Sequence, residues 1–300
     1  TAVDGQSITR QNYTALLRAG QSQYQLSLLD PETNGTETRT VSVQGNYAEN
    51  PIYYAATFDN DATGYLVYNF FAADKGDQTS SYDRALNNTL DEFKTKGVKN
   101  LILDLRYNGG GAISSALMLV SALVDNRSAD NIVSKNQFNR TYGDALIKKY
   151  GQEILNEYFF DKVTRYNDDE SITEFETVTT LGNQLEGVYI LTGQYTASAS
   201  ELVINCLKPY IGNRLHLIGD LTYGKNVGSI SIYEKNNPRN KWGMQPIVLK
   251  TANRDDFSDY GGGFEPEQFV KEFEENEGKL LPLGDENEPL LAAALFHIAN

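Results

Sequence analysis

A continuous apolar run that leads into three glycines most constrains what this chain can fold into. Residues 98–105 read Val-Lys-Asn-Leu-Ile-Leu-Asp-Leu, residues 109–111 are all glycine, and an Ala- and Leu-rich stretch then extends to Leu123. Strands that are buried on both faces have such runs, which favours a parallel sheet covered by helices. Glycines at the carboxyl end of such a strand let the backbone approach a ligand closely and present N–H groups to it. We therefore predict a strand, a ligand-binding turn and a helix.

A second apolar run has a similar organisation and carries candidate nucleophiles. Residues 186–192 form a predicted strand, which is followed by the small and hydroxylated stretch at 196–200 and by a helical pattern over 201–210. A turn from strand to helix exposes a side chain and directs the first N–H groups of the helix toward the same point, where negative charge is favoured. Ser198 and Ser200 are both candidates for a nucleophile there.

A third motif contains a lysine and admits two interpretations. Residues 219–225 read Gly-Asp-Leu-Thr-Tyr-Gly-Lys, which mimics the spacing of a phosphate-binding P-loop. A P-loop needs Ser or Thr directly after its lysine and a helix directly after the loop. Asn226 occupies the hydroxyl position, and residues 227–232 alternate like a strand. We therefore reject nucleotide binding and treat Lys225 as a catalytic candidate.

Lys225 is the best candidate for the base that a serine nucleophile requires. A lysine can accept the proton of a serine when burial keeps the amine neutral, and Ser-Lys pairs are a variant of the catalytic triad. The two histidines are weaker candidates, because His216 lies within an alternating strand and His297 lies within the last helix. We interpret both histidines as structural residues.

Composition excludes several other classes of function. The net charge of −14 and the pI near 4.6 argue against a nucleic-acid partner, which requires clustered Lys and Arg. A single cysteine, Cys206, has apolar neighbours and is expected to be buried, and two histidines are too few for an imidazole zinc site. The acidic stretch at 59–64 lacks the later glutamate of a calcium loop and is interpreted as a hairpin turn. We expect no metal, no cofactor and no membrane-spanning segment.

The other predicted helices and strands of this 300-residue chain are consistent with one large α/β domain. Residues 131–185 are insertion-like, and we expect them to form a cap over the site. The predicted helices lie at 81–96, 144–160 and 289–298, and the predicted strands or extended runs at 52–58, 64–71, 171–180, 214–219, 227–234 and 241–252, with a glycine-rich loop at 261–263.

The first residues form a small separate pattern. A turn precedes a helix that Thr9 is expected to cap, and alternating runs at 24–29 and 38–43 predict a hairpin whose turn includes Asp30 and Pro31. This order resembles the second half of a PDZ domain, with residues 3–8 matching the phrase that precedes its peptide-groove helix. We therefore expect residues 1–45 to form a partial PDZ-like module.

Three motifs together resemble the S41 family, the C-terminal processing (tail-specific) serine peptidases. They are Asp-Leu-Arg-Tyr-Asn-Gly-Gly-Gly at 104–111, Thr-Ala-Ser-Ala-Ser-Glu at 196–201 and Gly-Asp-Leu-Thr-Tyr-Gly-Lys at 219–225. They occur in the family's order, and the resemblance spans residues 52–300. It implies an α/β fold with a ClpP/crotonase-like core, in which a mixed sheet is covered by helices, and a peptidase domain at 46–300.

The resemblance also implies a role for particular residues. The family's nucleophile falls on Ser198 and its general base on Lys225, which leaves Ser200 as a residue of the helix turn. The backbone N–H groups of Ala199 and Gly110 would form the oxyanion hole. Family members often have a glutamine four residues after the lysine, and here that position is Ser229, a candidate for orienting the lysine.

The expected function is serine endopeptidase activity on protein or peptide substrates through an acyl-enzyme. Two rivals remain: a peptide- or ligand-binding protein on the same scaffold with weak or no catalysis, and a crotonase-like enzyme of acyl thioesters. The chain begins without Met, in mid-pattern, and we expect a processed form that has lost a secretory signal. The resemblance then implies the bacterial cell envelope, periplasmic or lipid-anchored at the outer surface, or secretion.

Overall fold

A computed structural model describes residues 2–18, 20–30, 33–167, 171–234, 237, 239–273 and 280–300. The chain divides into two compact units, Thr1–Glu49 and Asn50–Asn300, and each is described by itself. The turn expected at Asp30 and Pro31 lies partly outside the described residues, because Pro31 is not among them.

The first unit is a four-stranded antiparallel sheet with one short helix. Its strands have the order β2-β1-β3-β4, and the expected hairpin is formed by β3 and β4, in which Gln23 pairs with Ser42. The cap expected at Thr9 is wrong, since the helix begins later, after Asn12. Thr9 and Asn12 instead close a turn before the helix through mutual hydrogen bonds of 2.7 and 3.2 Å. The elements are β1 (Ala2–Val3), β2 (Gln6–Ser7), α1 (Tyr13–Leu17), β3 (Gln23–Leu29) and β4 (Thr36–Ser42).

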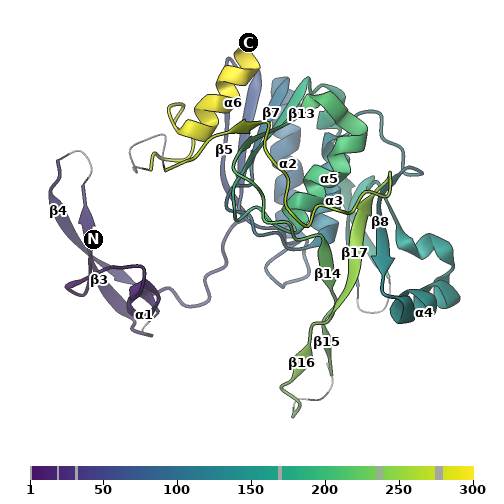
Figure 1. The fold of residues 1–300 in the computed structure, drawn as a ribbon, viewed down its shortest axis with the longest axis horizontal. Helices are drawn as coiled ribbons and strands as arrows, with labels where there is room; N and C mark the ends of the chain where they lie inside the picture. The colour runs from purple at the N-terminus through teal and green to yellow at the C-terminus, as the bar shows by residue number, and fades with distance from the viewer. Residues whose placement is uncertain are drawn as a thin grey trace. The chain divides into compact units, whose positions relative to one another are not determined.

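The second unit is built on a six-stranded mixed sheet, which confirms the predicted α/β fold. The sheet has the order β18-β13-β12-β7-β6-β5. Strands β6, β7, β12, β13 and β18 run parallel to one another, whereas β5 pairs antiparallel with β6. Figure 1 shows this sheet with helices against it. The strands are β5 (Ile52–Phe58), β6 (Thr63–Tyr68), β7 (Asn100–Asp104), β12 (Gly187–Thr192), β13 (Leu215–Gly219) and β18 (Gln268–Phe269).

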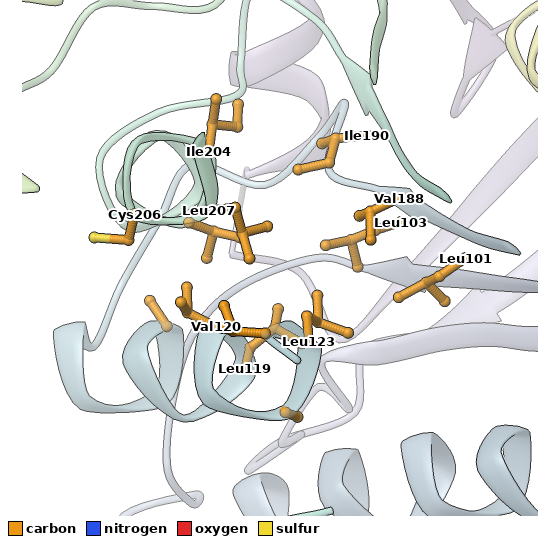
Figure 2. Packing of buried hydrophobic residues seen from close by; sticks show 14 of the residues in the cluster. Leu101, Leu103, Leu119, Val120, Leu123, Val188, Ile190, Ile204, Cys206 and Leu207 are labelled. Carbon is orange, nitrogen blue, oxygen red and sulfur yellow. The ribbon is translucent and has the colours of Figure 1, made fainter. Parts of the chain in front are cut away.

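Alternate residues of the strands bury opposite faces of this sheet. Leu101, Leu103, Val188 and Ile190 face helices α2 (Ser81–Lys96), α3 (Ile113–Leu123) and α5 (Ala199–Ile211), and they belong to the larger apolar cluster. Figure 2 shows these four side chains directed toward Leu119, Val120 and Leu123 of α3 and toward Ile204, Cys206 and Leu207 of α5. The opposite face, with Ile102, Tyr189 and Leu191, packs against helix α6 (Pro289–Ala299). The expected burial of Cys206 is confirmed.

A second sheet of four strands, all antiparallel to their neighbours, lies in the same unit and has the order β14-β17-β8-β9. Two strands of the segment at 131–185, β8 and β9, belong to this sheet. Strand β8 pairs with the later strand β17, and β9 pairs with β8. Whether that segment acts as a cap remains a prediction. The strands are β8 (Ile132–Phe138), β9 (Asn156–Tyr158), β14 (Val227–Ser229) and β17 (Ile247–Asn253), and separate hairpins are formed by β10 (Lys162–Tyr166) with β11 (Ile172–Thr177) and by β15 (Ile232–Tyr233) with β16 (Gly243–Met244).

The helix predicted over 144–160 is wrong in both its start and its end. Helix α4 spans Arg140–Tyr150, a 3-10 turn follows at Gln152–Leu155, and the chain then extends as β9. Gly151, with a φ of 87°, ends the helix, because a residue with a side chain would be strained there. Backbone pairing of β9 with β8, a tertiary interaction, overrides the local helical pattern. The other 3-10 turns are Leu181–Asn183 and Gly212–Arg214.

Candidate active site

The three predicted motifs meet at one edge of the six-stranded sheet. Strands β7, β12 and β13 are neighbours and parallel, so their carboxyl ends lie at the same edge. The turns at 105–111, 193–198 and 220–225 follow these three ends directly. The turns also bond to one another, since Ala197 N donates to Asn108 O at 3.1 Å and Tyr223 N donates to Thr196 O at 3.0 Å. The topology therefore places the turn with the serines between the glycine turn and the lysine turn.

Ser198 lies at the start of helix α5 in an unusual backbone conformation. It is the N-cap residue, with a φ of 58° and a ψ of −112°, and its side chain is half-buried. A residue other than glycine rarely adopts a positive φ, and strain of this kind costs on the order of 1–3 kcal/mol. A serine held at a sharp turn from strand to helix is the arrangement that exposes a nucleophilic hydroxyl in many hydrolases.

Gly110 packs directly against this turn. Its φ is +99°, and a Cβ atom added to it would lie 2.6 Å from the Cβ of Ser198 and 2.8 Å from the backbone nitrogen of Ala199. Any side chain here would therefore force the two turns apart. The N–H of Gly110 donates to Asn108 Oδ1 at 2.9 Å in this structure. The sequence did not predict that bond, which already engages one of the two expected oxyanion donors.

Asn108 fixes the glycine turn through hydrogen bonds within the turn and to two neighbouring segments. The side chain is fully buried, its Nδ2 donates to Tyr68 O at 2.8 Å, and its backbone oxygen accepts a hydrogen bond of 3.0 Å from Ser200 Oγ. Ser200 is buried within the first turn of α5, and its hydroxyl is used in this bond. The structure thus gives Ser200 a structural contact, while Ser198 has the accessible position.

Glu201 joins the serine turn to the lysine turn. Its side chain is fully buried, and its Oε2 accepts hydrogen bonds from the backbone nitrogens of Ser198 at 2.9 Å and Lys225 at 2.8 Å. Its Oε1 accepts from Gly224 N at 2.6 Å and from Thr222 Oγ1 at 2.7 Å. One carboxylate therefore fixes the backbone of both candidate catalytic residues.

The role of Glu201 was not predicted from the sequence, although a local signal is present. Ser198-Ala-Ser-Glu201 has the spacing of a capping box, in which a glutamate at the third helical position accepts the N–H of the N-cap residue. The additional bonds to Thr222 and Lys225 join segments more than twenty residues apart, and no local pattern reports them.

A second missed feature is the contact between two glycine-containing loops. A Cβ atom added to Gly224, whose φ is +91°, would lie 2.4 Å from the backbone oxygen of Gly261. In the same loop Thr222 N donates to Phe264 O, and Phe264 N donates to Thr222 Oγ1 at 2.7 Å. The glycine-rich loop at 261–263 thus supports the lysine turn from outside.

Ser198 and Lys225 line one cavity of about 620 Å³. The turn with Lys225 leads into strand β14, not into a helix, as the rejection of a P-loop required. Lys225 is exposed, so the burial that we expected for a lysine base is not supplied by the described protein residues. The other lining residues are Gly109, Gly111, Ala112, Ile113, Ser114, Ala199, Leu202, Asn226, Val227, Gly228, Ser229, Gln245, Thr251 and Tyr260.

The two histidines lie together, away from this cavity. Their ring centroids are 4.6 Å apart, and His216 stacks on Tyr189 at 4.9 Å. His216 Nδ1 is 2.9 Å from a carboxylate oxygen of Glu267, and neither histidine lines the cavity of Ser198. Within the described part of the chain, no group of three or more His, Cys, Asp or Glu side chains could hold a metal ion.

Comparison with known proteins assigns the chain to a family. The sequence model of peptidase family S41 matches residues 62–241, which is more than half of the chain. The chain belongs to this family. It is therefore a serine-type peptidase of family S41, as the three motifs implied. Comparison with curated protein sequences gave no match.

Solved structures show the same fold. A protein of Bacteroides fragilis named as an S41 protease is 25% identical, with a TM-score of 0.74, and the match covers 100% of this chain and 72% of that one. The photosystem II D1 C-terminal processing protease is 19% identical over 97% of this chain and 68% of its own, with a TM-score of 0.52. A protein of Parabacteroides merdae named as a peptidase is 17% identical over 85% and 67%, with a TM-score of 0.50. Helices long and apolar enough to cross a membrane are absent from the described residues.

Proposed function

We propose that this peptidase cleaves peptide bonds with Ser198 as the nucleophile and Lys225 as the general base. The observation that carries the proposal is the cavity that both side chains line, with Ser198 at a strained turn between strand and helix. The bonds of Glu201 to the backbone of both residues support the pairing, because they fix the two turns relative to each other.

The exposed position of Lys225 requires a contribution from the substrate. An amine accepts a proton only in its neutral form, and removal of water favours that form. A peptide bound in the cavity would cover Lys225 and supply the missing burial. Ser229 lines the same cavity at the end of β14, which supports the proposal that its hydroxyl orients the lysine.

The reaction then proceeds by acyl transfer. Lys225 Nζ takes the proton of Ser198 Oγ as the oxygen attacks the carbonyl carbon of the scissile bond. The tetrahedral intermediate collapses as the C–N bond breaks, and the amine leaves with the proton from Lys225 Nζ. A water molecule then attacks the resulting ester and gives a proton to Lys225 Nζ. The second tetrahedral intermediate collapses, Ser198 Oγ takes that proton back from Lys225 Nζ, and the carboxylate product departs.

Two backbone donors are proposed to stabilise the oxyanion. Ala199 N belongs to the residue directly after the nucleophile and heads helix α5, whose dipole adds to its effect. Gly110 N is the second donor, and the oxyanion would share or replace Asn108 Oδ1 as its acceptor. Removal of one such donor typically costs a factor of about 10²–10³ in kcat.

Ser198→Ala and Lys225→Ala test the assignment directly. We expect each variant to lose activity on an unstructured peptide by a factor of 10³ or more, because the residues act as a unit. A serine-directed covalent probe should label the wild-type protein at Ser198 and leave Ser198→Ala unlabelled. Cleavage at the wild-type rate by either variant would contradict the dyad, and a folded wild-type protein that neither cleaves nor reacts with the probe would indicate a ligand-binding protein.

The domain boundaries, the cellular location and the class of substrate are also proposals. The resemblance to tail-specific peptidases supports a partial PDZ-like module at residues 1–45, a peptidase domain at 46–300 and residence in the bacterial cell envelope, periplasmic or lipid-anchored, or secretion. In that setting protein chains or peptides in the envelope would be the substrates, and residues 131–185 would cover the cavity once a substrate is bound.

A further inference from the structure

A second cavity, of about 560 Å³, lies next to the cavity of Ser198. The two share Ile113 and Ser114, the first residues of helix α3, as lining residues. The walls of the second cavity are mainly apolar, with two acidic side chains. Its lining residues are Ile113, Ser114, Leu117, Asn136, Glu153, Ile154, Asn156, Glu157, Tyr158, Phe159, Phe160 and Leu249.

Strand β17 connects the two cavities along one face of the second sheet. Thr251 lines the cavity of Ser198, and Leu249, two residues earlier, lines the second cavity. Side chains two residues apart on a strand point to the same face and are separated by about 7 Å. Asn136 of β8, directly opposite Thr251, also lines the second cavity. Figure 1 shows β8 and β17 side by side. A single extended peptide can therefore reach both cavities.

The second cavity contains hydrogen-bond acceptors, on Asn136 and Glu157, and its lining has no basic side chain to pair with them. Asn136 is only 9% exposed, its Nδ2 donates to Glu157 Oε1 at 2.8 Å, and its Oδ1 has no hydrogen-bond partner among the described residues. No ion pair is found for Glu157 among those residues, and burial raises the pKa of its carboxyl group. The lining includes Glu153 and Glu157 but neither lysine nor arginine.

We propose that this second cavity is a subsite that binds a lysine or arginine side chain of the substrate, with Glu157 as the residue that determines the preference. The proposal rests on the peptidase function proposed above. The aliphatic stem of the basic side chain would lie against Leu117, Phe159 and Leu249, and its charged head would donate hydrogen bonds to the carboxylate of Glu157.

The chemistry of the cavity favours a basic side chain over the alternatives. An acidic side chain would be repelled by Glu157 and Glu153. A purely apolar side chain would fill the same walls but would leave the half-buried carboxylate of Glu157 with the Asn136 amide and no cation, which is costly for a charge removed from water. A long stem with a cationic end satisfies the walls and the carboxylate together.

Paired peptides can measure this preference. Peptides with acetylated N-termini and amidated C-termini would carry either lysine or norleucine, which has a similar stem without the charge, at each position around the cleaved bond. At one position we expect kcat/KM to be higher for lysine by about tenfold or more, the effect of one hydrogen bond to a charged group. Blocked termini ensure that a free amino terminus is not the bound cation.

Variants of Glu157 show whether that residue is responsible. Glu157→Gln should reduce the ratio of lysine to norleucine cleavage to about one, and Glu157→Lys should invert the preference toward a glutamate peptide. Glu174→Gln, which removes a charge from an exposed position on β11, is the matched control and should keep the wild-type ratio. The ratio within one variant cancels any general loss of catalysis or folding.

The outcomes separate this inference from the proposed function. Cleavage of both peptides at equal rates at every position, or a lysine preference that persists in Glu157→Gln, would overturn the subsite. If no peptide is cleaved, the proposed function fails. Fluorescence anisotropy then decides the subsite, with fluorescently labelled versions of the lysine and norleucine peptides binding to Ser198→Ala. Tighter binding of lysine peptides that Glu157→Gln abolishes would support it, and equal binding of the two peptides would overturn it.

Discussion

Glu201 and Arg106 are both buried charges beside the turns of the candidate active site, and the structure satisfies them with different partners. Glu201 accepts four hydrogen bonds from neutral donors, three of them backbone N–H groups. Arg106 is 3% exposed and forms ion pairs with Asp104 at 2.8 Å, Glu288 at 2.6 Å and Glu272 at 3.0 Å. One charge is thus held by dipoles and the other by opposite charges.

The two clusters also connect different parts of the fold. Arg106 follows the end of β7 and, through Glu288, fixes the start of helix α6, where Glu288 also accepts the backbone N–H of Leu291 at 3.0 Å. Glu201 connects only the serine and lysine turns. The difference indicates that the Arg106 cluster mainly stabilises the domain, whereas Glu201 mainly positions the candidate catalytic residues.

The largest expected effect comes from Arg106→Met, which tests the first half of this comparison. Three carboxylates would remain without their cation, two of them almost fully buried. Loss of one partner from a buried ion pair typically costs about 3–5 kcal/mol. We expect the free energy of unfolding, measured by urea titration, to fall by that amount.

Arg140→Met is the matched control for Arg106→Met. Arg140 pairs with Asp144 at 3.7 Å on helix α4, and both side chains are strongly exposed. Exposed pairs contribute about 0–1 kcal/mol, so this change should have little effect. Equal destabilisation by the two substitutions would show that the Arg106 cluster does not stabilise the domain.

Glu201→Gln has the second largest expected effect and tests whether Glu201 positions the candidate catalytic residues. An amide NH2 group would replace one carboxylate oxygen and would face two of the four donors. Hydrogen bonds to charged groups are worth about 1.5–3 kcal/mol, so we expect kcat/KM on a peptide to fall by about 100-fold. The loss should be mainly in kcat, because the turns move relative to each other.

Urea unfolding of Glu201→Gln distinguishes positioning from a general loss of stability. Glu186→Gln, at an exposed position before β12, is the control and should leave both kcat and stability close to wild type. If Glu201→Gln retained full kcat while the protein was measurably less stable, Glu201 would be a structural residue only.

The contrast also explains what the sequence could predict. The strands predicted at 98–105 and 186–192 and the turn with Ser198 were predictable, because apolar runs, glycines and a capping pattern are local signals. The roles of Glu201 toward Thr222 and Lys225, and the pairing of Arg106 with Glu288, depend on contacts between distant segments. The helix predicted over 144–160 was wrong at β9 for the same reason, since pairing with β8 decides the conformation of that segment.

Asp83 provides a third buried charge, and no ion pair is found for it among the described residues. It is 3% exposed in the first turn of α2, its Oδ1 has no hydrogen-bond partner among the described residues, and burial raises its pKa to about 7. Between the unfolded pKa near 3.8 and this folded value, the native state binds more protons than the unfolded state. The contribution of Asp83 to stability is therefore present at low pH and is lost as pH rises toward 7.

Asp83→Asn should consequently stabilise the protein at alkaline pH, an effect that neither Arg106→Met nor Glu201→Gln can show. We expect the free energy of unfolding to rise by about 2 kcal/mol at pH 8, below the limit of about 4 kcal/mol that the full pKa difference would give, and by less than half of that gain at pH 5. Urea titrations at both pH values measure this, with the exposed Asp144→Asn as the control. A gain of equal size at pH 5 would show that ionisation of Asp83 is not the cause, and a loss at pH 8 would show that its carboxylate is satisfied in the native state.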